Sequence, residues 1–246
     1  MLTAKDIILK PIDSKTANAL VKKLHYSGKV VNNSQFHIGA FIGGSLEGVM
    51  QFGPSLDKRK IQGLVSGTGW NEFIELNRLA FSDKLPRNSE SRAIALAMRI
   101  LRKHAPQLKW VISFADATQC GDGTIYRASG FVLTGIKKNN QIWIAPDEAG
   151  STFSRTSLTD NHSPNEKVRA RQILSLLPAT KSKNMVNGAS SMKVYEAAGF
   201  KPLPGFQLRY IYFLDKTCEK DLTVEILPYA RIKELGASMY LGKKCL

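Results

Sequence analysis

The segments Ser113-Phe114-Ala115-Asp116 and Gly123-Thr124-Ile125-Tyr126-Arg127-Ala128 decide the fold of this chain. The apolar run at 110–112 leads into the first segment and has the composition of a buried β-strand. A glycine-containing turn and a short helix follow Asp116. Because sheets present functional groups where their strands end, Asp116 lies where a catalytic acid or base is expected. Aspartate is also a favoured helix N-cap, so the position by itself leaves a purely structural role open.

Strands and helices are predicted to alternate along the chain. Ser14 is expected to cap the first helix, and Gly43-Gly44-Ser45 has the composition of a hairpin turn. The apolar residues of the second helix recur at helical spacing on one face. Helices are predicted over 15–24, 91–103, 124–128 and 192–198, and strands over 6–12, 37–42, 46–52, 74–81, 111–115, 131–135 and 207–214.

This order of elements resembles the GNAT acyltransferase fold, an α/β fold with a mixed central sheet and flanking helices. In that fold two neighbouring strands splay apart and form the cleft for the donor and the reaction. Here the splayed strands are expected at 74–81 and 111–115, which places Asp116 at the cleft. We expect a GNAT-like catalytic core over 1–148, a basic polar insertion over 149–191, and a C-terminal segment over 192–246 that completes the core.

The charge balance of the chain favours a polyanionic partner. There are 35 Lys and Arg residues against 20 Asp and Glu residues, which gives a net charge of +15. A basic excess of this size is typical of proteins that bind nucleic acid. A run of about 18 apolar residues and a signal-peptide pattern are both absent, so we expect a soluble intracellular protein without membrane contact. The cysteines lack the paired spacing of zinc sites, iron–sulfur sites or a disulfide framework.

Two arginines are candidates for binding the group donor. Alternation along the strand at 74–81 places Arg78 on the same face as Ile74, Leu76 and Ala80. A guanidinium on an apolar face needs a partner, either a structural carboxylate or a phosphate, a carbonyl or Asp116. Arg92 is expected in the first turn of its helix, where the macrodipole disfavours a cation unless an anion binds there. An ordinary solvated arginine is the alternative for Arg92.

The segment before that helix departs from the acetyl-CoA loop of GNAT enzymes. That loop has the pattern Gln/Arg-x-x-Gly-x-Gly/Ala, whereas Arg87-Asn88-Ser89-Glu90-Ser91-Arg92 carries Glu90 and Arg92 where small residues are required. A carboxylate is electrostatically unfavourable in a loop that cradles phosphates. The sequence therefore disfavours acetyl-CoA as the donor. It also lacks a methyltransferase signature, which argues against methyl transfer from S-adenosylmethionine.

Several short blocks resemble the Mom family of DNA-modification proteins from Mu-like phages. They cover roughly residues 20–135 and the strand near 210, and their order along the chain is that of the family. One departure occurs after Gln119, where the family pattern has Gly-His and this chain has Cys120-Gly121. The matching blocks are His25-Tyr26-Ser27, Glu75-Leu76-Asn77-Arg78-Leu79, Ser113-Phe114-Ala115-Asp116, Gly123-Thr124-Ile125-Tyr126-Arg127-Ala128 and Arg209-Tyr210-Ile211-Tyr212.

The resemblance implies an anti-restriction enzyme of a phage, acting in the host cytoplasm. Such an enzyme adds a carbamoylmethyl (acetamido) group to the exocyclic amine of adenine in double-stranded DNA and so shields the DNA from host nucleases. The resemblance further implies a GNAT-derived fold and a bound iron ion. By the same resemblance, His25, Tyr26 and Asp116 are the candidate metal ligands.

The residues are compatible with this chemistry. A basic protein can bind the duplex and flip an adenine into a pocket lined with aromatic side chains. The exocyclic amine is a poor nucleophile, so we expect Asp116 to accept its proton or its developing charge. Tyr126 and the hydroxyl of Ser113 are expected to orient the base or the donor carbonyl. Trp70 is a candidate wedge or stacking residue, with a role in the core as the alternative.

The donor and the reaction class leave alternatives open. A carbamoylmethyl amine is an isomer of a glycyl amide, so we hypothesise a glycyl donor such as an aminoacyl-tRNA, followed by rearrangement; a CoA-type donor is the alternative. The chain could instead be a GNAT-type N-acyltransferase that acts on a protein or a small amine. A third interpretation is a non-catalytic DNA-binding module in which Asp116 is only a cap.

Overall fold

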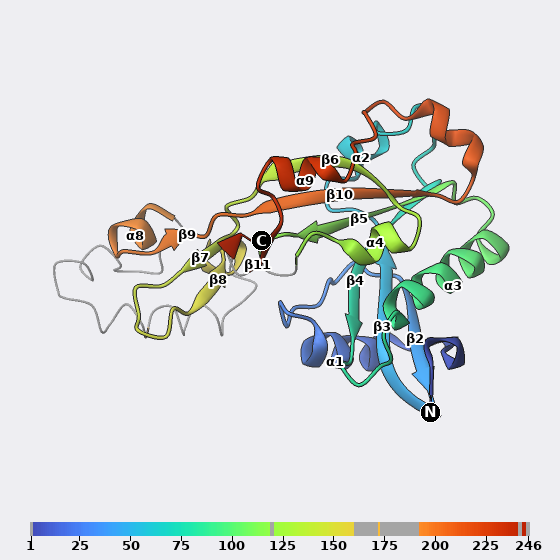
Figure 1. Cartoon of the computed structure of the whole chain (residues 1–246), viewed down its shortest axis with the longest axis horizontal. Coiled ribbons are helices and arrows are strands. Elements are labelled where there is room, and N and C mark those ends of the chain that lie inside the picture. The colour runs from blue at the N-terminus through green and yellow to red at the C-terminus, as the bar shows by residue number, and fades with distance from the viewer. Residues whose placement is uncertain (1, 119–120, 160–171, 173–191, 241–242, 245–246) are drawn as a thin grey trace.

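A seven-stranded mixed sheet forms the body of the protein. The computed structural model describes residues 2–118, 121–159, 172, 192–240 and 243–244 (Figure 1). The strands lie in the order β1-β2-β3-β4-β5-β10-β6. Their bounds are β1 Ile8–Pro11, β2 Phe36–Ile42, β3 Ser45–Gly53, β4 Phe73–Phe81, β5 Trp110–Asp116, β6 Val132–Lys138 and β10 Phe206–Phe213.

The two halves of this sheet diverge between β4 and β5. These strands run parallel and share only three paired positions, which end at Glu75 and Ile112, whereas the neighbouring pairs β3–β4 and β5–β10 are antiparallel. Beyond that point β4 continues with β2 and β3 while β5 leaves with β10 and β6 (Figure 1). This splayed parallel pair within a mixed sheet confirms the predicted GNAT-like fold.

A β-bulge in β4 changes the face on which Arg78 lies. The register with β3 shifts between Gln51 and Phe52, so that Asn77 is the extra residue of β4. Leu76 packs in the core beneath α3, while Ala80 packs against α1 on the opposite face. Arg78, two residues before Ala80, therefore shares the face of Ala80 but not that of Leu76. The prediction from uninterrupted alternation was wrong on this point, because one inserted residue inverts the alternation.

Helices cover both faces of the first half of the sheet. In α3 (Ser89–His104) the predicted apolar face is buried, with exposures of 0–3% at Ile94, Ala97, Met98 and Leu101. On the other face α1 (Ser14–Leu24) packs Ala17 and Val21 against the sheet. The N-cap of α1 is Asp13 and not the predicted Ser14. Asp13 has extended backbone angles and its Oδ1 accepts a hydrogen bond from the Thr16 amide at 2.9 Å, whereas Ser14 already lies within the helix.

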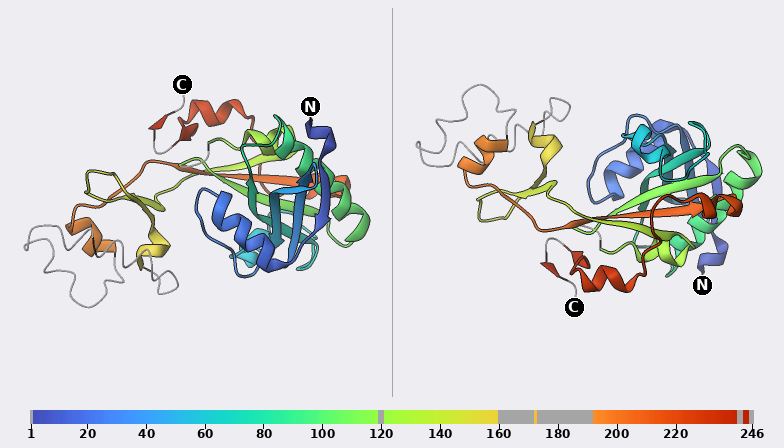
Figure 2. Two further views of the ribbon diagram at one scale, coloured as in Figure 1. Left: turned by 90° about the horizontal axis from the view of Figure 1, so that it is seen from below. Right: turned by 90° about the horizontal axis from the view of Figure 1, so that it is seen from above.

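A small lobe projects from the ends of β6 and β10, at the far end of the molecule from α3 (Figures 1 and 2). It contains a three-stranded sheet in the order β8-β7-β9 and a separate apolar cluster that includes Trp143, Phe153, Tyr195 and Phe200. Its elements are β7 Ile142–Ile144, β8 Thr152–Ser154, α5 Arg155–Thr159, α8 Met192–Ala197 and β9 Lys201–Pro202.

This lobe differs from the segmentation expected from the sequence. We expected the helix near residue 192 to complete the main core, but its Met192 and Tyr195 are buried with the residues of the lobe. The lobe also begins at β7, before the expected boundary at 148. Most of the expected insertion, residues 160–171 and 173–191, lies outside the described residues.

The remaining elements are short. Between β3 and β4 the chain forms α2 (Lys58–Gln62), and α4 (Thr124–Ala128) follows β5 as predicted. After β10 the chain forms a 3-10 helix at Lys216–Asp221, α9 (Ala230–Glu234) and the pair β11 (Met239–Tyr240) and β12 (Lys243–Lys244), while another 3-10 turn, Ala4–Asp6, precedes β1. Among the described residues, the helices are too short and too polar to cross a membrane.

Candidate active site

The divergence of β4 and β5 opens a cavity of about 580 Å³. The second half of β4 and the end of β5 form its walls. The residues that follow α1, the first turn of α3, and α4 close it from three sides. The cavity collects four of the residues singled out in the sequence: His25, Tyr26, Arg78 and Tyr126.

His25 is held as a neutral imidazole. It is the residue after α1, and its Nδ1 accepts a hydrogen bond from the Ser27 amide at 3.1 Å and lies 2.8 Å from the Ser27 hydroxyl. Burial, assisted by the nearby Arg78 guanidinium, lowers the pKa of His25 to about 4. Because Nδ1 accepts the amide hydrogen, the neutral ring carries its proton on Nε2. His25 can therefore donate a hydrogen bond at neutral pH without carrying a charge.

Arg78 is fixed by backbone carbonyl groups. Its Nε donates to the Lys29 carbonyl at 2.9 Å and its Nη1 donates to the Asn77 carbonyl at 2.7 Å. Burial lowers its pKa, and the nearby groups of Tyr26 and Glu75 partly offset that effect. Lys29 also reaches the small lobe, since its Nζ donates to the Ser154 hydroxyl at 2.7 Å. Arg78 thus presents a positioned positive charge in a partly buried cavity.

Aromatic rings form two parts of the cavity wall. Tyr126 is 7% exposed and packs against Phe131 and Tyr210, with ring centroids 5.4 and 5.2 Å away. Tyr26 is 52% exposed, and its ring lies 4.2 Å from that of His25. The structure therefore places one rigid and one accessible tyrosine beside the same space.

The turn before α4 is tightly packed. Gly123 has a φ of 73°, and a Cβ there would lie 2.7 Å from the ring of Tyr210. The Tyr210 hydroxyl donates to the Asp122 carbonyl, and burial raises the pKa of this tyrosine. Only glycine combines this backbone conformation with so close an aromatic neighbour. The matching block at 123–128 thus holds Tyr126 in place.

Ser113 and Asp116 lie outside the lining of this cavity. Ser113 is fully buried, and its hydroxyl donates to the Leu76 carbonyl at 3.1 Å. Asp116 ends β5, directly after the lining residues Phe114 and Ala115. Its Oδ1 accepts from the Thr118 amide at 2.9 Å and lies 3.4 Å from the Asn139 amide nitrogen. Burial raises the pKa of Asp116, and these hydrogen bonds partly offset the effect.

Arg92 is also outside the cavity. It lies in the first turn of α3, as expected, and its Nε is buried without a hydrogen-bond partner among the described residues. It lines neither the cavity between the strands nor the neighbouring hollow of about 400 Å³ at the loop between β4 and α3. Of the two arginines proposed from the sequence, only Arg78 lines the cavity that also contains His25, Tyr26 and Tyr126.

The cavity is also lined by three acidic residues that were not predicted from the sequence: Asp83, Glu90 and Asp122. Glu90 lies in the first turn of α3, and burial together with the nearby Asp83 raises its pKa. The acetyl-CoA loop pattern has a small residue at the position of Glu90, and this departure is the sequence signal that could have identified Glu90 as a residue of the cavity. A paired acidic wall at this helix start repels phosphate, whereas the usual helix N-terminus attracts it.

The three ligands implied for iron do not assemble in the described residues. His25 and Tyr26 line the cavity, but Asp116 does not. The Nδ1 of His25 accepts the Ser27 amide hydrogen, so its Nε2 carries the proton and is not free to bind a cation. Among the described residues, His, Cys, Asp and Glu side chains do not form a group of three suited to a metal ion. We therefore derive no step that involves a metal.

Solved structures and known sequences both include proteins similar to this chain. Among solved structures, spermidine/spermine N-acetyltransferase SpeG from Vibrio cholerae aligns with a TM-score of 0.44 at 9% identity, over 88% of this chain and 98% of that one. A GNAT family acetyltransferase from Elizabethkingia anophelis aligns with a TM-score of 0.39 at 18% identity, over 55% and 81%. At these scores we draw no inference about function from either structure.

The sequence matches are more specific. The protein named methylcarbamoylase mom from Escherichia phage Mu is 40% identical over 133 residues, which cover 54% of this chain and 55% of the phage protein. The match thus spans about half the length of that relative. A sequence model described as the Mom protein family matches residues 6–231, which include every element that surrounds the cavity. The chain belongs to the Mom protein family.

Proposed function

We propose that this protein transfers a carbamoylmethyl group to the exocyclic amine of adenine in double-stranded DNA and thereby protects phage DNA from restriction in the host cytoplasm. The observation that carries the proposal is the cavity between β4 and β5, where a neutral His25 and a fixed Arg78 face the same space. It lies within the region that matches the Mom family, and the named relative from phage Mu is a methylcarbamoylase.

His25 and Arg78 polarise the donor carbonyl in this proposal. A neutral imidazole donating from Nε2 and a guanidinium both stabilise negative charge that develops on a carbonyl oxygen. Because both groups are fixed by hydrogen bonds to the backbone, they need little rearrangement during the reaction. The fixed Tyr126 and the accessible Tyr26 supply surfaces against which a flipped adenine can stack.

Asp116 is the proposed proton acceptor. The adenine amine is a weak nucleophile, because its lone pair is delocalised into the ring, and it loses a proton as its new bond to carbon forms. A carboxylate whose pKa is raised by burial accepts a proton more readily near neutral pH. Asp116 directly follows the lining residues Phe114 and Ala115, so it lies next to the wall of the cavity. Ser113 supports the opening of the strands and does not touch substrate in this proposal.

The donor is proposed to lack a pyrophosphate at the start of α3. Glu90 and Asp83 occupy the place where a nucleotide donor of the CoA type would put its phosphates, and their negative charges disfavour that arrangement. A glycyl group carried by an aminoacyl-tRNA avoids this conflict. The adenine amine would attack the glycyl carbonyl, the ester bond would break and release the tRNA hydroxyl, and the glycyl amide would then rearrange to its carbamoylmethyl isomer. Cells that express the protein and are fed isotopically labelled glycine should contain labelled modified adenine. Unlabelled modified adenine would exclude this donor.

Mass spectrometry of nucleosides tests the reaction itself. DNA from cells that express the protein should contain carbamoylmethyl-deoxyadenosine, and DNA from cells that express Arg78→Met should not. Unmodified deoxyadenosine in the first sample, together with an acylated protein or small amine, would favour an ordinary N-acyltransferase. DNA binding without any modified product would favour a non-catalytic module.

A further inference from the structure

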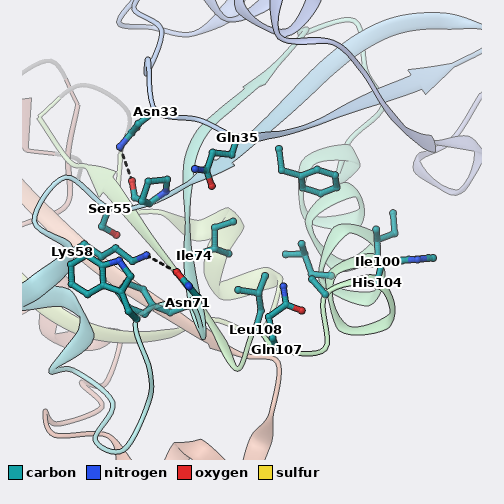
Figure 3. A pocket seen from close by; sticks show the side chains of 16 residues that line it. Asn33, Gln35, Ser55, Lys58, Asn71, Ile74, Ile100, His104, Gln107 and Leu108 are labelled. Carbon is teal, nitrogen blue, oxygen red and sulfur yellow. Dashed lines mark hydrogen bonds between the residues drawn. The ribbon is translucent and has the colours of Figure 1, made fainter.

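A second and larger cavity lies at the opposite end of β4. It has a volume of about 820 Å³, within the range of about 300–1,000 Å³ that is typical of small-molecule sites. The first residues of β4, the last turns of α3 and the loops around residues 33–36, 54–58 and 104–108 line it (Figure 3). None of the residues that form the cavity between the splayed strands contributes to this one.

Carboxamide side chains approach this second cavity from several segments. Asn33, Gln35, Asn71 and Gln107 all line it (Figure 3). Asn33 donates from Nδ2 to the Pro54 carbonyl at 3.0 Å, which leaves its buried Oδ1 without a hydrogen-bond partner among the described residues. Carboxamides pair in a bidentate manner with the edges of nucleobases, adenine above all. The exposed carboxamides of Gln35, Asn71 and Gln107 can bind a ligand that carries both hydrogen-bond donors and acceptors.

An aromatic platform and a cation complete the lining. Trp70 is 48% exposed, and the Nζ of Lys58 lies 4.6 Å from its ring centroid and 5.5 Å from that of Phe73. Burial lowers the pKa of Lys58. Its polar contact is Asn71 Oδ1 at 3.5 Å, and no carboxylate pairs with it in the described part of the chain. An anion beside Lys58 would compensate this charge, and a planar base would cover Trp70.

We propose that this cavity binds one unpaired nucleobase, stacked on Trp70 and hydrogen-bonded by the carboxamides, with its phosphate beside Lys58. A hydrocarbon ligand would leave the exposed carboxamides without hydrogen-bond partners, and a simple phosphate would leave the aromatic surface exposed to water. Ile74 in this cavity and Arg78 in the other are four residues apart on one strand, roughly 13 Å at about 3.3 Å per residue. The proposal goes beyond the reaction and does not require it.

Tryptophan fluorescence tests the proposal with the full-length protein. Trp110 and Trp143 are 0% and 4% exposed, so Trp70 is the accessible fluorophore among the three tryptophans. Adenosine monophosphate should quench its emission with saturation. Ribose 5-phosphate, which has the same phosphate and no base, should not. Equal binding of both compounds would overturn the recognition of a base.

Variants identify the cavity as the site. Ligand-observed NMR should show that Trp70→Ala weakens adenosine monophosphate binding about ten- to hundredfold and that Gln35→Leu weakens it less, whereas Trp70→Phe retains it. Leu56→Ala is the control, because Leu56 also lies between β3 and β4, is 94% exposed and does not line the cavity. Unchanged affinity in Trp70→Ala would overturn the proposal.

Oligonucleotides identify the source of the base. Single-stranded DNA, duplex DNA and RNA of one sequence should displace adenosine monophosphate with different affinities. Preference for RNA would assign the cavity to an RNA-borne donor, and preference for DNA would assign it to the modified strand. Failure of all three to compete would overturn the assignment to a nucleic-acid chain. Because these are binding assays, they give an answer even if the protein does not modify adenine.

Discussion

The Ser113 hydroxyl donates to the carbonyl of Leu76 at 3.1 Å, just beyond the last paired position of β4 and β5. Where the ladder ends, this carbonyl has lost its partner on the neighbouring strand. A side chain from β5 replaces that partner, so the strands separate without leaving a buried acceptor unsatisfied. The block that first drew attention in the sequence thus contains the residue that stabilises the opening.

Replacing Ser113 by alanine should therefore lower stability. We expect the free energy of unfolding to fall by about 1–3 kcal/mol in Ser113→Ala, because a buried carbonyl loses its donor. Urea denaturation followed by circular dichroism measures this change. Ser66→Ala, on an exposed turn, is the control and should change stability by less than about 0.5 kcal/mol. A Ser113→Ala protein of normal stability that has lost activity would point to catalysis.

The neutral state of His25 predicts a dependence of stability on pH. The folded protein binds a proton at His25 with a pKa of about 4, while an unperturbed histidine has a pKa of 6.5. Between these values the unfolded chain binds more protons, so the free energy of unfolding should fall as the pH drops from 6.5 to 4 and level off below. The loss is at most about 3 kcal/mol.

His25→Gln should remove this component of the pH dependence. Denaturation midpoints at pH 7 and pH 4.5, compared between the wild type and the variant, give the measurement. The exposed His104 provides the control, since His104→Gln should keep the wild-type dependence. An identical pH profile in His25→Gln would show that His25 is not buried as a neutral group.

Adenine modification should require an arginine at position 78, and not only a positive charge. Arg78→Lys keeps a positive charge but cannot donate to two carbonyl groups and face the cavity in the same geometry. We expect the rate of adenine modification to fall about a hundredfold or more. The Arg92→Lys variant should modify adenine at close to the wild-type rate, because Arg92 does not line the cavity. The reverse order of the two variants would assign donor binding to Arg92.

Asp116→Asn separates the catalytic role of this residue from its structural role. Asparagine can still accept a hydrogen bond from the Thr118 amide, so the fold should tolerate the change. The rate of modification should fall by about 10²- to 10⁴-fold if Asp116 accepts the proton. Asp215→Asn is a matched control, because Asp215 accepts from the Thr217 amide at 2.9 Å in the same local geometry. Full activity in Asp116→Asn would leave Asp116 as a turn residue only.

Gly53 should not tolerate a side chain. A Cβ at this position would lie 2.6 Å from the Asn33 carbonyl oxygen and 2.7 Å from Asn77 Oδ1. Gly53→Ala should therefore cost about 1–3 kcal/mol of stability, as overpacking does in other cores. Gly63→Ala, whose nearest neighbour would be 3.7 Å away, should be tolerated. Thermal unfolding of the two variants side by side makes the comparison.

The sequence contained enough information to predict the sheet and to place most of the cavity between its splayed strands. Local apolar patterns indicate strands and helices one by one, and His25, Tyr26, Arg78 and Tyr126 come together as the splay of β4 and β5 requires. The face of Arg78 was predicted wrongly, because a bulge at Asn77 depends on pairing with β3 and leaves no mark in the alternation.

The second cavity and the small lobe could not be predicted for a similar reason. Asn33, Lys58, Trp70 and Gln107 meet only after the main sheet has formed, since each comes from a different segment of the chain. In the lobe, Trp143 and Tyr195 share a cluster across about fifty residues of chain. Contacts between such distant segments follow from the assembled fold and not from local periodicity.

The gap between β4 and β5 is part of the folded protein before any substrate binds. Ser113 and Arg78 donate hydrogen bonds to two backbone carbonyl groups beside the gap, those of Leu76, where the pairing of β4 with β5 has ended, and of Asn77, the bulged residue of β4. The free energy of folding therefore already includes the cost of keeping two strands of one sheet apart. Substrate meets a preorganised space, and its binding energy remains available for orienting the adenine amine against the donor.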